Sequence, residues 1–116
     1  MSEPAPSQNI TVFMLIKTTP AWLALPPKAR FAFFDAHVRP LLAARPQVRL
    51  RYFDAEFYTA RCTDVMMWET SDQSAYRAIV EELRETLFWD HYFQIVEIVP
   101  AVEDAYADHY DQDRIA

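Results

Sequence analysis

The chain has 116 residues, of which 52% are apolar and 15% are aromatic, a composition that suits one folded domain and excludes a disordered chain. Acidic residues outnumber basic ones by 17 to 11, and the net charge of −6 excludes a general nucleic-acid binder, because phosphate contacts need a basic field. The apolar runs are far shorter than a bilayer span, so no membrane segment is predicted.

The sequence contains no glycine. Glycine is the residue that allows a positive φ or a close approach of the backbone to phosphate. Its absence therefore excludes a P-loop, a dinucleotide-binding GxGxxG, a GxSxG nucleophile elbow and a standard EF-hand loop. Turns must use Pro, Asn, Asp and Ser instead.

The chain is predicted to be one domain of residues 10–116, preceded by a flexible leader of residues 1–9. The leader has neither a basic start nor an apolar centre, so it does not resemble a signal peptide. A single cysteine, Cys62, leaves no partner for an internal disulfide, and this favours a reducing, cytoplasmic location.

Charge is distributed unevenly along the sequence. Residues 28–61 contain seven basic and three acidic groups, whereas acidic residues concentrate near the C-terminus. Two explanations remain open for the basic centre. It could hold a small anion, or the charges could be solvated or complementary between copies, with one copy's acidic tail near another's basic segment. We favour the second.

The first half of the chain alternates strand and helix signals. Asn9–Thr18 is rich in β-branched and aromatic residues and is predicted to be a strand. Thr19 followed by Pro20 is a typical helix start. Residues 27–44 show helical spacing of apolar residues, and Pro40 should kink that helix near Arg39.

Three further strands and two helices are predicted. Residues 48–58 form the second strand, with a β-bulge near Tyr52 and Phe53 that brings its charges to one face. Residues 62–70 form the third strand. Asp72 introduces an amphipathic helix. Residues 92–99 form the fourth strand, which Pro100 ends, and residues 101–115 form a last helix.

The order is therefore β-α-β-β-α-β with a C-terminal helix, an α+β, ferredoxin-like plan in which helices cover one face of a four-stranded antiparallel sheet. The other face is predicted to carry Phe13, Leu15, Met66 and Trp68. This surface is too apolar to remain in water. We therefore expect a homodimer in which two sheets pack face to face.

Three segments resemble the darcynin family and together cover most of the chain: TVFMLIKTTPAWL, PQVRLRYFDAEFYTARCTDVMMWET and EELRETLFWDHYFQIVEIVPAVEDAY. The resemblance implies a dimeric α+β barrel and a function that is not known. The plan is more loosely similar to muconolactone isomerases and cofactor-independent quinol-type monooxygenases. In the monooxygenases, a polar residue and a tryptophan four positions later line the cavity. Asp64 and Trp68 have that spacing, although aspartate replaces the usual asparagine and Met66 lies between them.

Six residues are predicted to meet in a cavity between the two sheets. Trp68, Phe13, Lys17 and Glu97 would contact a ligand, and Arg51 would stabilise an anion. A buried Asp64 or Glu97 would have a raised pKa and could act as a base near neutrality. The alternative is that these charges pair and fix strand register or the dimer contact.

His37 is a second candidate base at the cavity mouth, or alternatively a helix-flank histidine bonded to Asp35 or to the backbone. The histidines lack i, i+4 ligand spacing and only one cysteine is present, so no metal site is predicted, and no cofactor.

The leading hypothesis is a homodimer whose cavity binds a small aromatic or enol-like molecule, with or without turnover. The rival is a protein-interaction or structural module whose sheet face is fully packed.

Overall fold

The computed structural model describes residues 9–116 and shows one four-stranded antiparallel sheet in the order β2-β3-β1-β4. The strands are β1 (Ile10–Thr18), β2 (Arg49–Asp54), β3 (Asp64–Thr70) and β4 (Phe93–Ala101). The predicted leader lies almost entirely outside the described residues. The strand order is that of the ferredoxin-like fold, and the predicted α+β class is confirmed.

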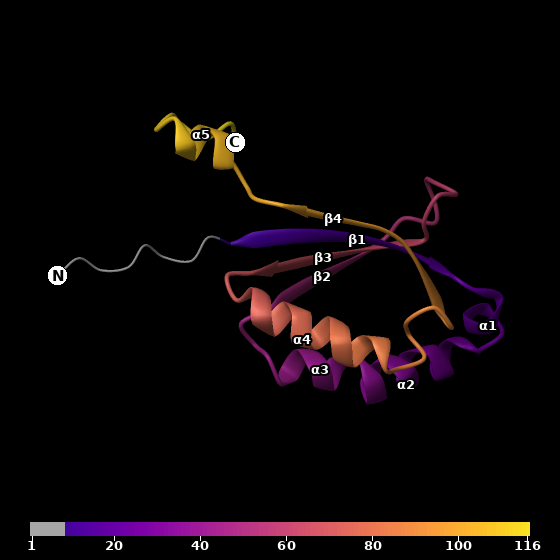
Figure 1. The fold of residues 1–116 in the computed structure, drawn as a ribbon. Helices are drawn as coiled ribbons and strands as arrows, with labels where there is room; N and C mark the ends of the chain where they lie inside the picture. The colour runs from indigo at the N-terminus through magenta and orange to yellow at the C-terminus, as the bar shows by residue number, and fades with distance from the viewer. Residues whose placement is uncertain (1–8) are drawn as a thin grey trace.

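The four helices α1 (Pro20–Leu23), α2 (Pro27–His37), α3 (Arg39–Ala43) and α4 (Gln73–Arg84) all lie on one face of the sheet (Figure 1). The short helix α5 (Ala105–His109) lies beyond the end of β4 and covers neither face. We call the uncovered side the open face. No helix within residues 9–116 is both long and apolar enough to cross a bilayer.

Local sequence explains where the helices begin and end. The Thr19 side chain accepts a hydrogen bond from the Trp22 amide and caps α1. The predicted kink is confirmed, because Val38 separates α2 from α3 just before Arg39-Pro40. Asp72 caps α4 by accepting a hydrogen bond of 3.0 Å from the Ala75 amide.

The core lies between the sheet and its helices. Even-numbered residues of β1 and β3 point toward the helices, and α4 contributes Ile79 and Leu83 to the same layer. The largest fully buried side chains belong to this layer: Met14, Ile16, Met66, Trp68, Ile79, Leu83, Phe88 and Phe93.

Aspartate takes the place of glycine in the turns. Within residues 9–116 every residue with positive φ is an aspartate, at positions 90, 104 and 111. Aspartate tolerates the left-handed region because its short polar side chain can bond locally. The expectation that turns would use such residues is confirmed.

Several predicted boundaries and one bulge are wrong. β2 ends at Asp54, and its register with β3 runs without interruption, so the bulge near Tyr52 is absent. The irregularity instead lies between β1 and β4, beside Leu15. β4 continues through Pro100, because an edge strand does not need the amide that proline lacks. The last helix is confined to 105–109.

Candidate functional site

A pocket of about 750 Å³ lies between the helix-facing side of the sheet and helices α1 to α3. Its walls are mainly aromatic and aliphatic, with polar side chains at the end formed by β2 and β3. The lining residues include Trp22, Phe34, Tyr52, Asp54, Glu56 and Asp64.

The aromatic wall is assembled from elements far apart in sequence. Trp22 of α1 packs edge-on against Phe34 of α2, with ring centroids 5.4 Å apart, and contacts Phe93 of β4 at 4.8 Å. Phe34 in turn contacts Tyr52 of β2 at 5.9 Å. Such offset and edge-to-face contacts fix the rings relative to one another. The wall is therefore a continuous layer of packed rings from α1, α2, β2 and β4.

Three carboxyl groups converge at the polar end of the pocket. Asp54 and Asp64 are direct cross-strand partners at the end of the β2–β3 ladder, and Glu56 follows in the turn after β2. One oxygen from each residue lies within 4.8 Å of those of the other two. Like charges directly opposite each other on a sheet are destabilising. Their convergence at a pocket wall is an arrangement that can bind a cation or transfer a proton.

Asp64 is the buried member of this group, with 5% of its surface exposed. Its Oδ2 accepts a hydrogen bond of 2.6 Å from the Thr63 hydroxyl. Burial raises the pKa of Asp64 to about 6, the Thr63 hydrogen bond opposes this rise, and the adjacent Asp54 adds to it. The carboxyl group therefore exchanges its proton close to neutral pH.

Tyr52 extends the polar end toward the aromatic wall. Although 39% of the residue is exposed, its side chain lines the same pocket as Asp64. Burial and then the negative charge of Asp64 raise the pKa of Tyr52 above its ordinary value. The phenol therefore stays protonated and can donate a hydrogen bond to Asp64 or to a ligand.

Among the described residues, the three pocket carboxyl groups have no basic partner. Two arginines also line the pocket: Arg30 donates to the carbonyls of Trp22 and Leu23 at 3.2 and 3.0 Å and keeps its charge, whereas Arg39 pairs with Asp35 at 2.7 Å. Within residues 9–116, no lysine, arginine or histidine lies within salt-bridge distance of the three pocket carboxyl groups.

This arrangement has two chemical capacities. Carboxylate oxygens at this spacing can surround a cation, either an ammonium group or a hard metal ion. An aspartate that titrates near neutrality beside a tyrosine hydroxyl can also accept a proton from a bound molecule.

The predicted convergence of site residues on one sheet face is wrong. In the register of β1 with β3, Phe13 is opposite Met67, and Met14 is opposite Met66. Asp64, Met66 and Trp68 therefore face the helices, whereas Phe13 and Leu15 face away from them. Within each strand, successive side chains alternate between the two faces as expected. Alternation alone does not show whether the odd-numbered residues of one strand share a face with the odd- or the even-numbered residues of the next.

Trp68 does not line the pocket. It is fully buried against α4, where its ring lies 5.9 Å from Tyr76, and its indole N–H has no hydrogen-bond partner within the described residues. The ligand-contact role predicted for Trp68 therefore has no support from its position, which is that of a core residue.

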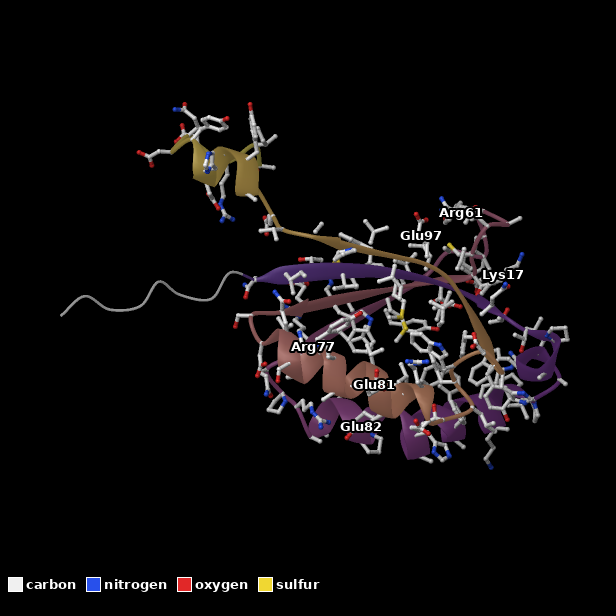
Figure 2. All side chains as sticks on the ribbon, viewed as in Figure 1. Lys17, Arg61, Arg77, Glu81, Glu82 and Glu97 are labelled. Carbon is white, nitrogen blue, oxygen red and sulfur yellow. The ribbon has the colours of Figure 1, made fainter. Side chains whose placement is uncertain are left out.

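The other predicted residues are dispersed. At one end of the open face Glu97 pairs with Arg61, and the Lys17 ammonium donates to the carbonyl of Ala60 (Figure 2). Arg51 lies on the same face over the ring of Phe53, 5.1 Å from its centroid. His37 is exposed at the end of α2, beside Phe33. Of the seven residues, only Asp64 lines the pocket.

Sequence reasoning missed Tyr52, Asp54 and Glu56 as site residues. The predicted bulge placed Asp54 and Glu56 with the arginines of the same strand. If the strand alternates strictly, without a bulge, Arg49 and Arg51 lie on one face and Asp54 lies on the other. This alternation was the sequence signal that could have placed Asp54 correctly. That Asp54 stands opposite Asp64 could be learned only from the register of the two strands.

Comparison with solved structures shows the fold alone. The chain is similar to a mutant chlorite dismutase from Candidatus Nitrospira defluvii, with a TM-score of 0.69 and 12% identity over 85% of this chain. It is also similar to a putative chlorite dismutase, with a TM-score of 0.68 and 20% identity over 84% of this chain. The chain spans 41% and 44% of the lengths of those two proteins.

Comparison at the level of sequence is more specific. Residues 1–116 match the family model described as "Darcynin, domain of unknown function". A darcynin homolog from Granulibacter bethesdensis is 50% identical over 91% of this chain and 86% of that protein. A second homolog, from Streptomyces avermitilis, is 46% identical over 92% of this chain and 89% of that protein. The chain therefore belongs to the darcynin family.

Proposed function

We propose that this protein binds a small organic cation, a protonated amine attached to an aromatic or apolar body, in the pocket between the sheet and helices α1 to α3. The single observation that carries the proposal is the group of three carboxyl groups without a basic partner at the end of an aromatic pocket.

Each part of such a ligand has a counterpart in the pocket. The apolar body would pack against Trp22, Phe34 and neighbouring aliphatic side chains. The ammonium group would lie among Asp54, Glu56 and Asp64, where its charge offsets their mutual repulsion. Aromatic rings also attract cations through their faces, which adds to the preference for an amine over a carboxylate.

Thermal-shift measurements and calorimetry with 2-phenylethylamine, phenylacetate and phenol test this charge preference at constant ring size. The amine should raise the melting temperature, because a ligand that binds only the folded state stabilises it. Phenylacetate should have no effect. Asp54→Asn and Asp64→Asn should each weaken amine binding about tenfold or more, as expected for loss of a charged partner.

The matched control is Glu81→Gln, which removes an exposed carboxylate on α4 outside the pocket. It should leave amine binding unchanged. Equal binding of phenylacetate, or no binding of any amine in a broad panel, would refute the proposal. Binding of Ca²⁺ or Mg²⁺ alone, without any amine response, would instead assign the three carboxyl groups to a metal ion.

A second candidate function is proton transfer on a bound enolisable molecule. It is favoured by one observation, the pKa of about 6 for Asp64 beside the Tyr52 hydroxyl. Exchange of deuterium from solvent into an enolisable ketone or lactone tests it by NMR. Exchange that follows the ionisation of Asp64 and is lost in Asp64→Asn would support catalysis, and absence of exchange across the panel would leave only binding.

We also propose that the protein is a homodimer formed through its open faces. Phe13 is 36% exposed at the centre of this face, Val99 and Phe53 are also exposed, and Leu15, Val65 and Met67 are half-buried. No described element of the same chain covers them (Figure 1). Contiguous apolar patches of this kind mark interfaces in soluble proteins. Sedimentation velocity over a range of concentrations tests the association.

A further inference from the structure

The C-terminal arm, defined here as residues 102–116, stands away from the rest of the molecule (Figure 1). It is held mainly by its own contacts. Arg114 pairs with Asp108 at 3.1 Å, the Ile115 amide donates to Asp104 Oδ1 at 3.1 Å, and the Gln112 amide donates to the Ala107 carbonyl at 2.9 Å. The arm is therefore a small folded unit tethered to the end of β4.

Such a unit needs a surface to dock on. Its helix has five residues, well below the length at which an isolated helix is stable in water. Its large apolar side chains are exposed: Tyr106 by 79%, Ile115 by 88%, and Tyr110 by more than half. Fifteen residues cannot form a core of their own. The exposed side chains therefore indicate a contact outside this chain's own body.

The negative charge of the arm favours docking on a positively charged surface. The arm contains five acidic residues and one basic residue, Arg114. The open face carries Arg49 and Arg51 on β2, and within residues 9–116 no carboxylate lies within 4.0 Å of either guanidinium. Glu69 is opposite Arg49 in the ladder and offsets one of these two charges, so one positive charge remains at this corner of the face.

The sheet order explains how the arm of one copy could meet this corner on another. β2 and β4 are the two edges of the sheet, and the start of β2 and the end of β4 lie at the same end of the strands. If two open faces pack about a twofold axis parallel to the strands, β4 of each copy lies over β2 of the other. The arm that follows β4 is then beside the partner's Arg49.

We propose that the C-terminal arm of each copy docks on the other copy, placing Tyr106 and Tyr110 over the start of the partner's β2 and its acidic side chains near Arg49 and Arg51. This inference rests on the homodimer proposed above. It makes the dimer reciprocal, because the same contact occurs twice about one axis.

Disulfide trapping tests the position of the arm. In a Cys62→Ser background, a chain carrying Tyr106→Cys is mixed with one carrying Arg49→Cys and oxidised. A covalent heterodimer should form. The matched control replaces the second chain with Lys17→Cys, at the opposite end of the same face, and should give little covalent product. Preferential trapping with Lys17→Cys would overturn the proposed axis and the docking contact.

Charge removal tests the energetics of the same contact. Asp111→Asn with Asp113→Asn spares the two ion pairs that Arg114 makes within the arm and should weaken dimerisation about tenfold in low salt. The difference from wild type should vanish near 1 M NaCl, where charges are screened within a few ångströms. The control Glu81→Gln with Glu85→Gln removes two exposed carboxylates from the α4 region and should not change association.

The possible outcomes distinguish the arm-docking proposal from the homodimer proposal. A full-length chain that remains monomeric at all concentrations refutes both proposals. A chain that dimerises with the same affinity with and without the arm mutations retains the face-to-face dimer and refutes arm docking.

Discussion

Asp64 shows how burial and a neighbouring charge set the chemistry of one residue. It lies directly opposite Asp54 in the β2–β3 ladder, and only 5% of its surface is exposed. Both effects disfavour the ionised form, and the hydrogen bond from Thr63 only partly offsets them. The carboxyl group of Asp64 therefore changes its charge near pH 6, where most carboxyl groups are already ionised.

This shift predicts a pH dependence of stability. The pKa of Asp64 is about 6 in the folded protein, against 3.8 for an unperturbed aspartate, so the folded state binds more protons than the unfolded state between about pH 4 and pH 6. Asp64 therefore lowers the free energy of unfolding as pH rises through this window, by about 1–3 kcal/mol. Urea titrations of wild type and Asp64→Asn at several pH values measure it.

Asp64→Asn should be more stable than wild type above pH 6 and should lose this part of the pH dependence, because the amide can still accept from Thr63. Glu85→Gln, which changes an exposed carboxylate just after α4 and outside the proposed interface, serves as the control and should follow wild type. A difference between Asp64→Asn and wild type that stays constant from pH 4 to pH 7 would contradict the shifted pKa.

At the scale of elements, α1 depends on a junction between distant segments. The Thr19 side chain caps α1 and also donates a hydrogen bond of 2.7 Å to the carbonyl of His91, and the Thr19 amide donates to the carbonyl of Tyr92. This junction holds the end of β1 against the segment that leads into β4. Through α1 it also positions Trp22 and Leu23 at the pocket.

Thr19→Ala should lower the free energy of unfolding by about 1–2 kcal/mol, because it removes a helix cap and the side-chain hydrogen bond to the His91 carbonyl. Thr19→Ser keeps the hydroxyl and should retain most of the stability. Chemical denaturation of the three proteins measures the effect. Equal losses in Thr19→Ala and Thr19→Ser would show that the methyl group matters more than the hydroxyl.

At the scale of the whole molecule, the uncovered sheet face is the largest unexplained feature of a single copy. Helices α1 to α4 occupy one side only, and α5 is displaced beyond the end of β4 (Figure 1). A stable interface buries about 1,200–2,000 Å² in total, and a four-stranded face with Phe13 at its centre suits that size.

Phe13→Lys should convert the proposed dimer to a monomer, because it places an unpaired charge at the centre of an apolar interface. Leu87→Lys changes an exposed leucine in the turn after α4 and should remain dimeric. Analytical ultracentrifugation distinguishes the two, and circular dichroism checks that both variants are folded. Identical association of both variants would place the interface elsewhere.

The sequence by itself determined the class of fold, the element order and most helix starts. These follow from local causes: β-branched runs, the caps at Thr19 and Asp72, and the break before Pro40. It also led to the family, through segments that cover most of the chain. It placed Asp64 among the functional candidates, though for a cavity on the wrong side of the sheet.

Only the tertiary structure decided which face each residue occupies and which residues meet. Both faces of β1 are apolar: one carries Val12, Met14 and Ile16, and the other carries Phe13 and Leu15. The alternation of residues therefore could not distinguish the core face from the open face. The meeting of Asp54 with Asp64 depends on strand register. The pocket walls depend on how α1 and α2 pack against the sheet, which long-range contacts fix and local sequence does not encode.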